Sequence, residues 1–187
     1  MDDTGYVDQP GDEEIPDGLT QGSLSALEAV YRALHPGVVA YLRAHGADEP
    51  EDLAADCFVQ LARALPRFEG DWSDLRALTF TIARHRAIDA GRKRSRRRTD
   101  PSAAAALVEA SRSGDVEGEA LAALGNAAAT AMVGLLPEAQ AEVLRLRVLA
   151  DLSVAETARI LGKRPGAVRA LQLRGLRRLA ALLGEGE

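Results

Sequence analysis

The chain has 187 residues, of which 47 % are hydrophobic and only 4 % aromatic, and its formal net charge is −5. This length allows one ordinary domain or two small ones, and the abundance of Ala, Leu and Arg favours helices over sheets. The single cysteine, Cys57, excludes an internal disulfide and a Cys-rich zinc site. The three histidines are far apart in the sequence, so we expect no metal and no cofactor.

The hydropathy pattern predicts a cytoplasmic protein without membrane insertion. No apolar run approaches the roughly 18 residues that a membrane-spanning helix needs. The N-terminus is acidic, where a signal peptide would be basic and then apolar.

The net charge hides a very uneven distribution along the chain. Residues 1–18 carry seven acids and no base, whereas residues 84–98 carry eight Arg or Lys against one acid. Residues 159–178 carry seven Arg or Lys and no acid. Because local fields decide where a phosphate backbone binds, the two basic segments indicate a nucleic-acid-binding protein.

The acidic tail, residues 1–18, is expected to be disordered because it has few apolar groups to bury. A first helix should follow, capped by Ser23 or Ser25, with Ser25 and Glu28 fitting a capping box. His35-Pro36-Gly37 is expected to bend or interrupt this helix, which should stop at Gly46.

A second helix is predicted to begin near Glu49, with Pro50 in its first turn, and to end at Pro66. Cys57 lies at helical spacing between Leu53 and Leu61, which favours a small core residue over a redox switch. A third helix should run from about Ser73 into the arginine run. The expected buried stripe of the second helix is Leu53, Cys57 or Phe58, Leu61 and Leu65.

Residues 99–128 are Ala-rich, with five acids against one Arg, and are predicted to be a flexible linker with room for one short helix. Residues 129–187 again show a helical pattern. The predicted fold is therefore all-α, with two small helical domains, residues 19–98 and 129–187, joined by this linker.

The second domain contains a helix-turn-helix pattern within VAETARILGKRPGAVRALQL, residues 154–173. Ser153 and Glu156 form a capping box that marks the first helix, and Gly162 suits the left-handed turn that follows. Pro165 suits the start of the second helix. Ala158 and Val168 complete the pattern, because a small and an apolar residue at these positions allow the two helices to pack closely. An ordinary helical hairpin would share these signals.

The basic side chains of the second helix favour DNA over a plain hairpin. Arg suits guanine and Gln suits adenine in the major groove, while the remaining Arg and Lys side chains bind phosphates. The residues predicted to bind duplex DNA are Lys163, Arg164, Gly166, Arg169, Gln172 and Arg174.

The first domain offers a second nucleic-acid-binding region at the arginine run of its third helix. Phe68 and Trp72, two of seven aromatic residues, precede this helix. Aromatic rings beside arginines suit stacking on unpaired bases. For Trp72 the alternative is a ring that fills the core of the helical bundle.

Both halves resemble one family, the extracytoplasmic-function (ECF) sigma factors of bacterial RNA polymerase. The segments EDLAADCFVQLARALPRFEG and LRALTFTIARHRAID are similar to its second conserved region. The segment LLPEAQAEVLRLRVLADLSVAETARILGKRPGAVRALQLRGLRRL is similar to its fourth region. His85 departs from the common Asn and Arg164 from the common Ser or Thr.

The resemblance implies a factor that binds core RNA polymerase and promoter DNA and that is controlled by an anti-sigma factor. Polymerase would bind Asp52, Asp56 and Gln60, and the second domain would bind the −35 element. The residues implied for the unpaired −10 element are Phe68, Trp72, Arg84, His85 and Arg92.

Two other classes of protein are alternatives to this interpretation. A helix-turn-helix regulator would bind duplex DNA without polymerase, and its first domain would sense a ligand or dimerise. An enzyme is not predicted, because the sequence shows no Gly-rich phosphate loop, nucleophile–base pair or metal cluster, and so no catalytic residue.

Overall fold

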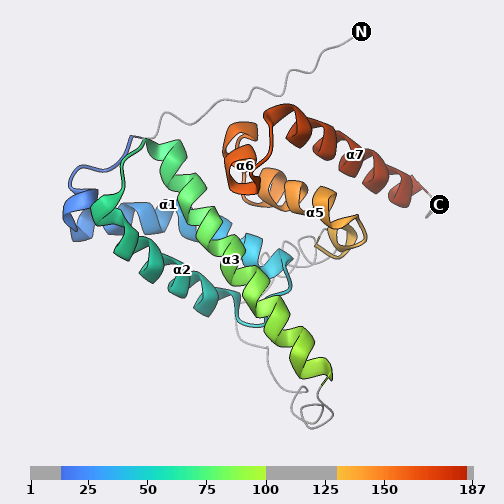
Figure 1. Ribbon diagram of the computed structural model, residues 1–187, viewed down its shortest axis with the longest axis horizontal. Helices are drawn as coiled ribbons and strands as arrows, with labels where there is room; N and C mark the ends of the chain where they lie inside the picture. The colour runs from blue at the N-terminus through green and yellow to red at the C-terminus, as the bar shows by residue number, and fades with distance from the viewer. Residues whose placement is uncertain (1–13, 100–129, 185–187) are drawn as a thin grey trace, which may run out of the picture.

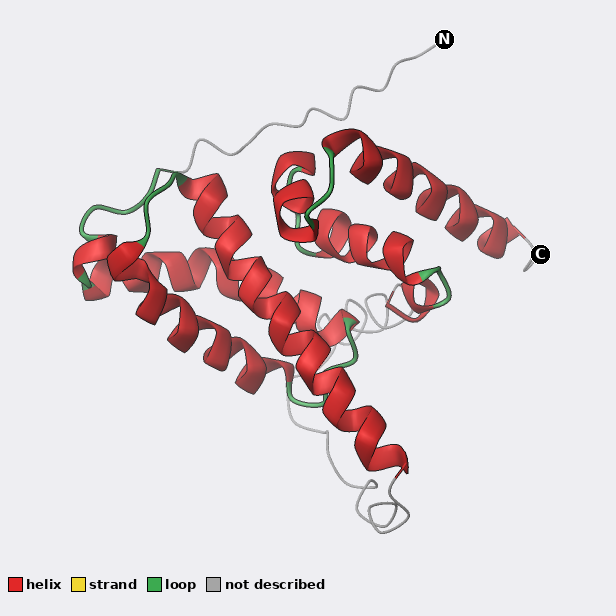
Figure 2. Cartoon of the chain, in the orientation of Figure 1, coloured by secondary structure: helices red, strands yellow, loops and turns green. Residues whose placement is uncertain are grey.

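The computed structural model describes residues 14–99 and 130–184, and every regular element within these two ranges is helical (Figure 2). The expected linker therefore lies outside the described residues, as do residues 1–13 of the expected tail. In chain order the elements are η1 (Leu19–Gln21), α1 (Leu24–Ala44), α2 (Pro50–Ala64), η2 (Leu65–Arg67), α3 (Trp72–Thr99), α5 (Glu138–Leu144), η4 (Arg145–Leu149), α6 (Val154–Leu161) and α7 (Pro165–Gly184).

The first domain is a three-helix bundle of α1, α2 and α3 (Figure 1). Its core lies between the three helices, and Cys57 is fully buried there, as the helical spacing predicted. Ile15 also packs against this core, so the ordered part of the domain begins within the segment expected to be a tail. The largest fully buried side chains of this core are Leu19, Tyr41, Leu42, Leu61, Leu65, Leu75 and Phe80.

The expected interruption of α1 is wrong, because the helix runs without a break from Leu24 to Ala44 with Pro36 inside it. Ser23, one of the two predicted caps, is the N-cap residue but makes no side-chain capping bond, and the Ser25–Glu28 capping box is wrong because Ser25 lies within the helix. Proline removes one backbone donor, which costs on the order of 3 kcal/mol in a helix interior. Burial of the following turn, including Val38 and Leu42, offsets this cost because the chain can bury those side chains only by continuing as a helix.

The helix ends of the second domain follow the local signals closely. Ser153 Oγ accepts from the Glu156 amide, and the Glu156 carboxylate accepts in return from the Ser153 amide. Gly162 ends α6 in the left-handed conformation, with φ of +60°, and α7 begins at Pro165. The helix-turn-helix is thus present, with Ala158 and Val168 buried between α6 and α7.

The segment before the helix-turn-helix departs from a regular helix. α5 is a seven-residue α-helix that continues as one turn of π-helix, η4. π-Turns are rare and often mark functional positions in helices. This turn places Leu146 and Ala150 toward the first domain, where both are buried.

The two domains pack against each other: α6 contacts α3, beside which it lies in Figure 1, and η4 contacts α1. The core of the first domain continues across this boundary. Gly37 of α1 lies close to Ala150, because a Cβ atom built on the glycine would be 3.8 Å from the Ala150 carbonyl oxygen. Four apolar residues of the second domain belong to the same buried cluster, namely Leu146, Ala150, Leu152 and Ile160.

Candidate nucleic-acid and polymerase interface

The second helix of the helix-turn-helix, α7, presents the predicted basic surface. Val168 is fully buried and fixes the rotation of the helix against α6. Five of the six residues predicted to contact duplex DNA are exposed, namely Lys163, Arg164, Gly166, Arg169 and Arg174. This geometry leaves the N-terminal turns of α7 free to enter a major groove.

Gln172 has a different environment from the other five. Its Oε1 accepts a hydrogen bond of 3.1 Å from Arg147 Nε, and Arg147 also donates to the Leu152 carbonyl. Arg147 is buried, so Gln172 is half-buried against η4. Bidentate contact with adenine uses the amide oxygen of Gln172, and one of the two lone pairs of this oxygen already accepts from Arg147.

The residues predicted for the unpaired −10 element are only partly brought together. His85 and Arg92 are exposed on α3, and Phe68 is half-buried in the preceding loop. Trp72 is 7 % exposed and packs in the core of the first domain, which confirms the alternative prediction of a ring that fills the helical bundle. Its ring is therefore not available for stacking in this conformation.

The side of α2 that points away from the core is acidic. Asp52, Asp56 and Gln60 are all exposed and lie four residues apart, so they share one side of the helix. A groove of about 440 Å³ runs between this side and α3. Its charged lining residues are Asp48, Glu49, Asp52, Asp56, Arg86, Asp89, Lys93 and Arg94.

A cluster of charged groups surrounds Glu142 of α5, and no local sequence pattern predicted it. Glu142 Oε1 accepts hydrogen bonds from the Tyr41 hydroxyl at 2.8 Å and from Arg84 Nε at 3.0 Å. Its Oε2 lies 2.8 Å from His45 Nε2, which is not aligned as a hydrogen bond, and 3.6 Å from Arg145 Nη1. We call these five residues, Tyr41, His45, Arg84, Glu142 and Arg145, the Glu142 cluster.

The ionisation of the cluster follows from burial and neighbouring charge. Burial alone would raise the pKa of Glu142, but His45, Tyr41 and Arg145 outweigh it and lower the pKa to about 2. Burial raises the pKa of Tyr41 above its ordinary range, and the Glu142 charge adds to this effect. Glu142 is therefore an anion and Tyr41 a neutral donor near neutral pH.

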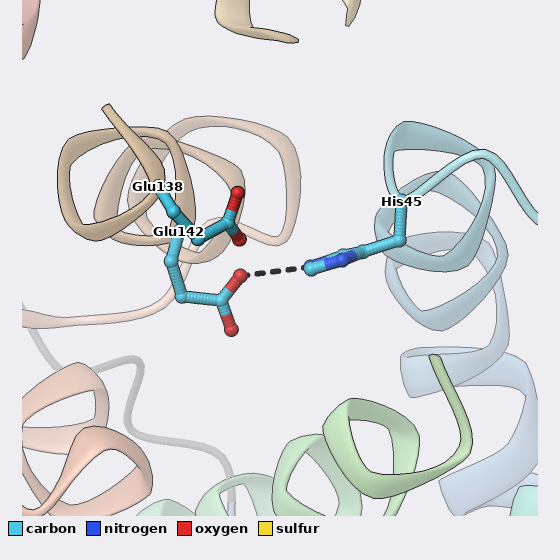
Figure 3. A group of neighbouring side chains, drawn as sticks. All are labelled: His45, Glu138 and Glu142. Carbon is cyan, nitrogen blue, oxygen red and sulfur yellow. Dashed lines mark ion pairs between the residues drawn. The ribbon is translucent and has the colours of Figure 1, made fainter. Parts of the chain in front are cut away.

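The same place offers a possible set of metal ligands, which Figure 3 shows pointing toward one another. His45 lies just beyond the end of α1, and Glu138 and Glu142 come from α5. Each offers a ligand atom within 4.8 Å of the others. The guanidinium groups of Arg84 and Arg145 already balance the carboxylate charge, so this chemistry favours ion pairs over a bound cation.

Comparison with known proteins places these features in one family. Residues 30–97 match Sigma-70 region 2, and residues 127–179 match Sigma-70, region 4. The chain is 33 % identical over 171 residues to the ECF RNA polymerase sigma factor ShbA of Streptomyces griseus, covering 87 % of this chain and 90 % of that protein. It is 36 % identical over 166 residues to SigD of Mycobacterium tuberculosis, covering 84 % of this chain and 77 % of SigD.

The ECF sigma factor BldN of Streptomyces coelicolor is 36 % identical over 156 residues, which cover 83 % of this chain and 56 % of BldN. Two solved structures share the fold at 21 % identity. CnrH, in complex with the cytosolic domain of CnrY, has a TM-score of 0.68, covering 90 % of this chain and 94 % of CnrH. RpoE of Bartonella quintana, in complex with the anti-sigma factor NepR, has a TM-score of 0.63, covering 88 % of this chain and 100 % of the RpoE chain.

The chain therefore belongs to the sigma-70 family, and within it to the ECF sigma factors. Sigma factors are regulatory proteins of transcription. Among the helices of the described ranges, none is both long enough and apolar enough to cross a membrane.

Proposed function

We propose that this chain binds core RNA polymerase in the cytoplasm and directs it to promoters as a binding subunit without an activity of its own. The first domain contacts the unpaired −10 element and the second reads the −35 element as duplex. The single observation that carries this proposal is the pairing of an exposed basic α7, set on a formed helix-turn-helix, with a bundle matching Sigma-70 region 2. A helix-turn-helix regulator has no need of that bundle.

The acidic face of α2 is the proposed docking surface for polymerase. Exposed Asp52 and Asp56 together with Gln60 offer charge and hydrogen-bond acceptors without an apolar core, which suits a basic protein surface. Asp56 lies 3.7 Å from Arg86, and the Asp56 side chain is 61 % exposed and that of Arg86 39 %. This weak ion pair leaves the carboxylate free to exchange partners.

An anti-sigma factor is the proposed inhibitory partner. RpoE of Bartonella quintana was solved with the anti-sigma factor NepR, and CnrH was solved with the cytosolic domain of CnrY. In this chain, the outer side of α7 exposes Leu173, Leu176 and Leu183, which is a large apolar surface for a helix end. This surface supports a protein partner that covers α7.

The test is run-off transcription with core polymerase and the purified chain on a panel of promoters, together with co-purification of polymerase from lysate. We expect promoter-dependent transcripts and co-purification. A chain that binds operator duplex, yet neither retains polymerase nor starts transcripts on any promoter, would be a regulator of the alternative class.

A further inference from the structure

We propose that Arg147 is a positioning residue for base reading: its guanidinium sets the orientation of α7 from inside the domain. Arg147 lies in the π-turn η4 and is 6 % exposed. It donates through Nε to Gln172 of α7 and through Nη1 to the carbonyl oxygen of Leu152. One side chain thus joins three elements: η4, the loop that leads into α6, and α7.

The π-turn accounts for the direction of the Arg147 side chain. Arg145, Leu146 and Arg147 are consecutive and all buried, whereas a regular surface helix buries only one stripe of its residues. The wide turn includes a hydrogen bond from the Ala150 amide to the Arg145 carbonyl. Leu146 packs in the core of the first domain, and the next residue, Arg147, is directed to α7 instead. The irregular turn therefore makes the contact with α7 possible.

Gln172 lies on the packed side of α7. It follows Val168 by four residues and precedes Gly175 by three, and both of these residues are buried. Val168 packs among apolar residues of α5 and α6. A Cβ atom built on Gly175 would be 3.0 Å from Leu144, so the α7 backbone lies close to α5 at this point. Gln172 is thus a polar residue in the middle of a largely apolar contact.

The hydrogen bond restricts rotation of α7 in a way that the apolar contacts do not. Apolar burial has no preferred direction, and Gly175 has no side chain that could interlock with α5. The bond from Arg147 has a preferred angle as well as a preferred length, so it fixes the direction in which the Gln172 side of α7 points. Arg147 is itself held by its second bond, to the Leu152 carbonyl.

Arg169 is the base-reading residue whose position this bond controls. It follows the buried Val168 by one residue and is exposed, so it lies about 100° around the helix from the packed side. A rotation of α7 would move the Arg169 guanidinium within the major groove, and bidentate contact with guanine needs two N–H groups in alignment. This step rests on the proposed function, in which α7 reads duplex DNA. Arg147 then affects which base is read more than how tightly the phosphates are bound.

The first experiment measures the orientation of α7 and does not depend on promoter binding. Spin labels at Ala155→Cys on α6 and Ala181→Cys on α7 occupy exposed positions, and the native Cys57 is fully buried. Gln172→Met removes the acceptor with little change in size, whereas the matched control, Gln172→Glu, keeps an acceptor oxygen. Pulsed electron paramagnetic resonance should give a broader distribution of label distances for Gln172→Met than for the wild-type chain and Gln172→Glu. Equal widths in all three proteins would overturn the proposal, whether or not the chain reads promoters.

The second experiment measures base preference by competition binding on a panel of −35 duplexes. The readout is the ratio of the affinity for the preferred duplex to that for a duplex with one base pair changed, in which a uniform loss of affinity cancels. We expect Arg147→Met to lower this ratio about threefold or more at the base pair read by Arg169, because residues coupled through a backbone shift interact at this level. Gln172→Met should act in the same way, and Gln172→Glu should keep the wild-type ratio.

Two controls separate positioning from a general loss of stability. Ser153→Ala removes a capping bond of α6 that does not involve Arg147 or Gln172, so it should lower stability and leave the ratio unchanged. In the Arg169→Ala background, Arg147→Met should have no further effect at that base pair, because no arginine is left there to be displaced.

Two results on the duplex panel would contradict the positioning role. One is a ratio that falls as far in Ser153→Ala as in Arg147→Met. The other is a new preference for adenine in Arg147→Met, which would mean that Gln172 reads bases directly once it is released. A wild-type chain that binds every duplex equally would count against the proposed function alone, since the label distances decide the orientation of α7 independently.

Discussion

Arg147 and Gln172 form a hydrogen bond that ties the recognition helix to the π-turn before the helix-turn-helix. Arg147 Nε donates to Gln172 Oε1 at 3.1 Å. The neighbouring Arg169 lies one turn earlier on α7 and is exposed. The same helix thus presents one residue free to read bases and another already used for packing.

Arg169→Ala should therefore weaken −35 binding more than Gln172→Ala. We expect Arg169→Ala to cost about 1–3 kcal/mol and to relax base preference at one position. Gln172→Ala should cost less binding free energy, and it should also lower the free energy of unfolding because it removes the hydrogen bond from Arg147. Arg177→Ala, farther from the start of the helix, should weaken binding equally on all sequences. Competition binding on a panel of −35 duplexes measures these effects, and identical profiles for the three variants would mean that α7 enters the groove in another orientation.

Charge reversal on α2 tests the polymerase surface. Asp52→Lys/Asp56→Lys should abolish retention on core polymerase, because two repulsive contacts replace two attractive ones. Glu28→Lys/Glu69→Lys is the control, since it makes the same change in net charge at two exposed positions of the first domain. Analytical gel filtration with core polymerase reports binding. Retention of the Asp52/Asp56 variant at wild-type strength would exclude this face as the docking surface.

The turn between α6 and α7 depends on the left-handed conformation of Gly162. A Cβ atom at this position would meet nothing within 4 Å, so the cost of Gly162→Ala arises from the backbone alone. With φ at +60°, we expect a loss of about 1–2 kcal/mol in the free energy of unfolding. Gly166→Ala is the control: it also meets nothing within 4 Å, has no left-handed φ and lies inside α7, so it should be neutral or stabilising. Urea unfolding followed by circular dichroism compares the two, and equal destabilisation would contradict the argument.

The stabilising effect of Glu142 should depend on pH in a defined direction. Its pKa is lowered from 4.5 to about 2 in the folded chain, so its contribution is fully present above about pH 4.5 and is lost as pH falls toward 2. Tyr41, His45, Arg84 and Arg145 face the carboxylate and are common to the wild-type chain and Glu142→Gln. The difference in unfolding free energy between the two proteins, a few kcal/mol near neutral pH, should therefore shrink toward pH 2. A difference that is constant with pH would mean that the charge of Glu142 contributes nothing.

The acidic tail gives a prediction from sequence alone, because residues 1–13 lie outside the described structure. Five of the seven acids of the expected tail lie within residues 1–13, and tethered acids near basic surfaces can compete with phosphate. Deleting residues 1–13, which precede the packed Ile15, should increase non-specific DNA affinity of the free protein, most strongly at low salt. DNA binding across a salt series measures the effect. Coincident low-salt curves for the truncated and full-length chains would indicate a passive solubilising tail.

Much of this protein could be predicted from local sequence. The capping box of Ser153 and Glu156, the turn at Gly162 and the start of α7 at Pro165 are each specified by residues within a few positions. Such signals depend on backbone hydrogen bonds and φ preferences, which neighbouring residues control. The basic face of α7 and the acidic face of α2 could be predicted for the same reason, since helical spacing places their side chains.

Other features depend on residues that are distant in the chain. Nothing near Pro36 signals that α1 continues through it, because the compensating burial comes from α2, α3 and η4. Tyr41 and Glu142 are 101 positions apart, and only docking of the domains brings their side chains within 2.8 Å. Periodicity places Trp72 and Arg84 on a helix, but the packing of neighbouring helices buries the first and pairs the second. Packing and ion pairing are properties of three-dimensional neighbours, whereas helix signals are properties of neighbours in sequence.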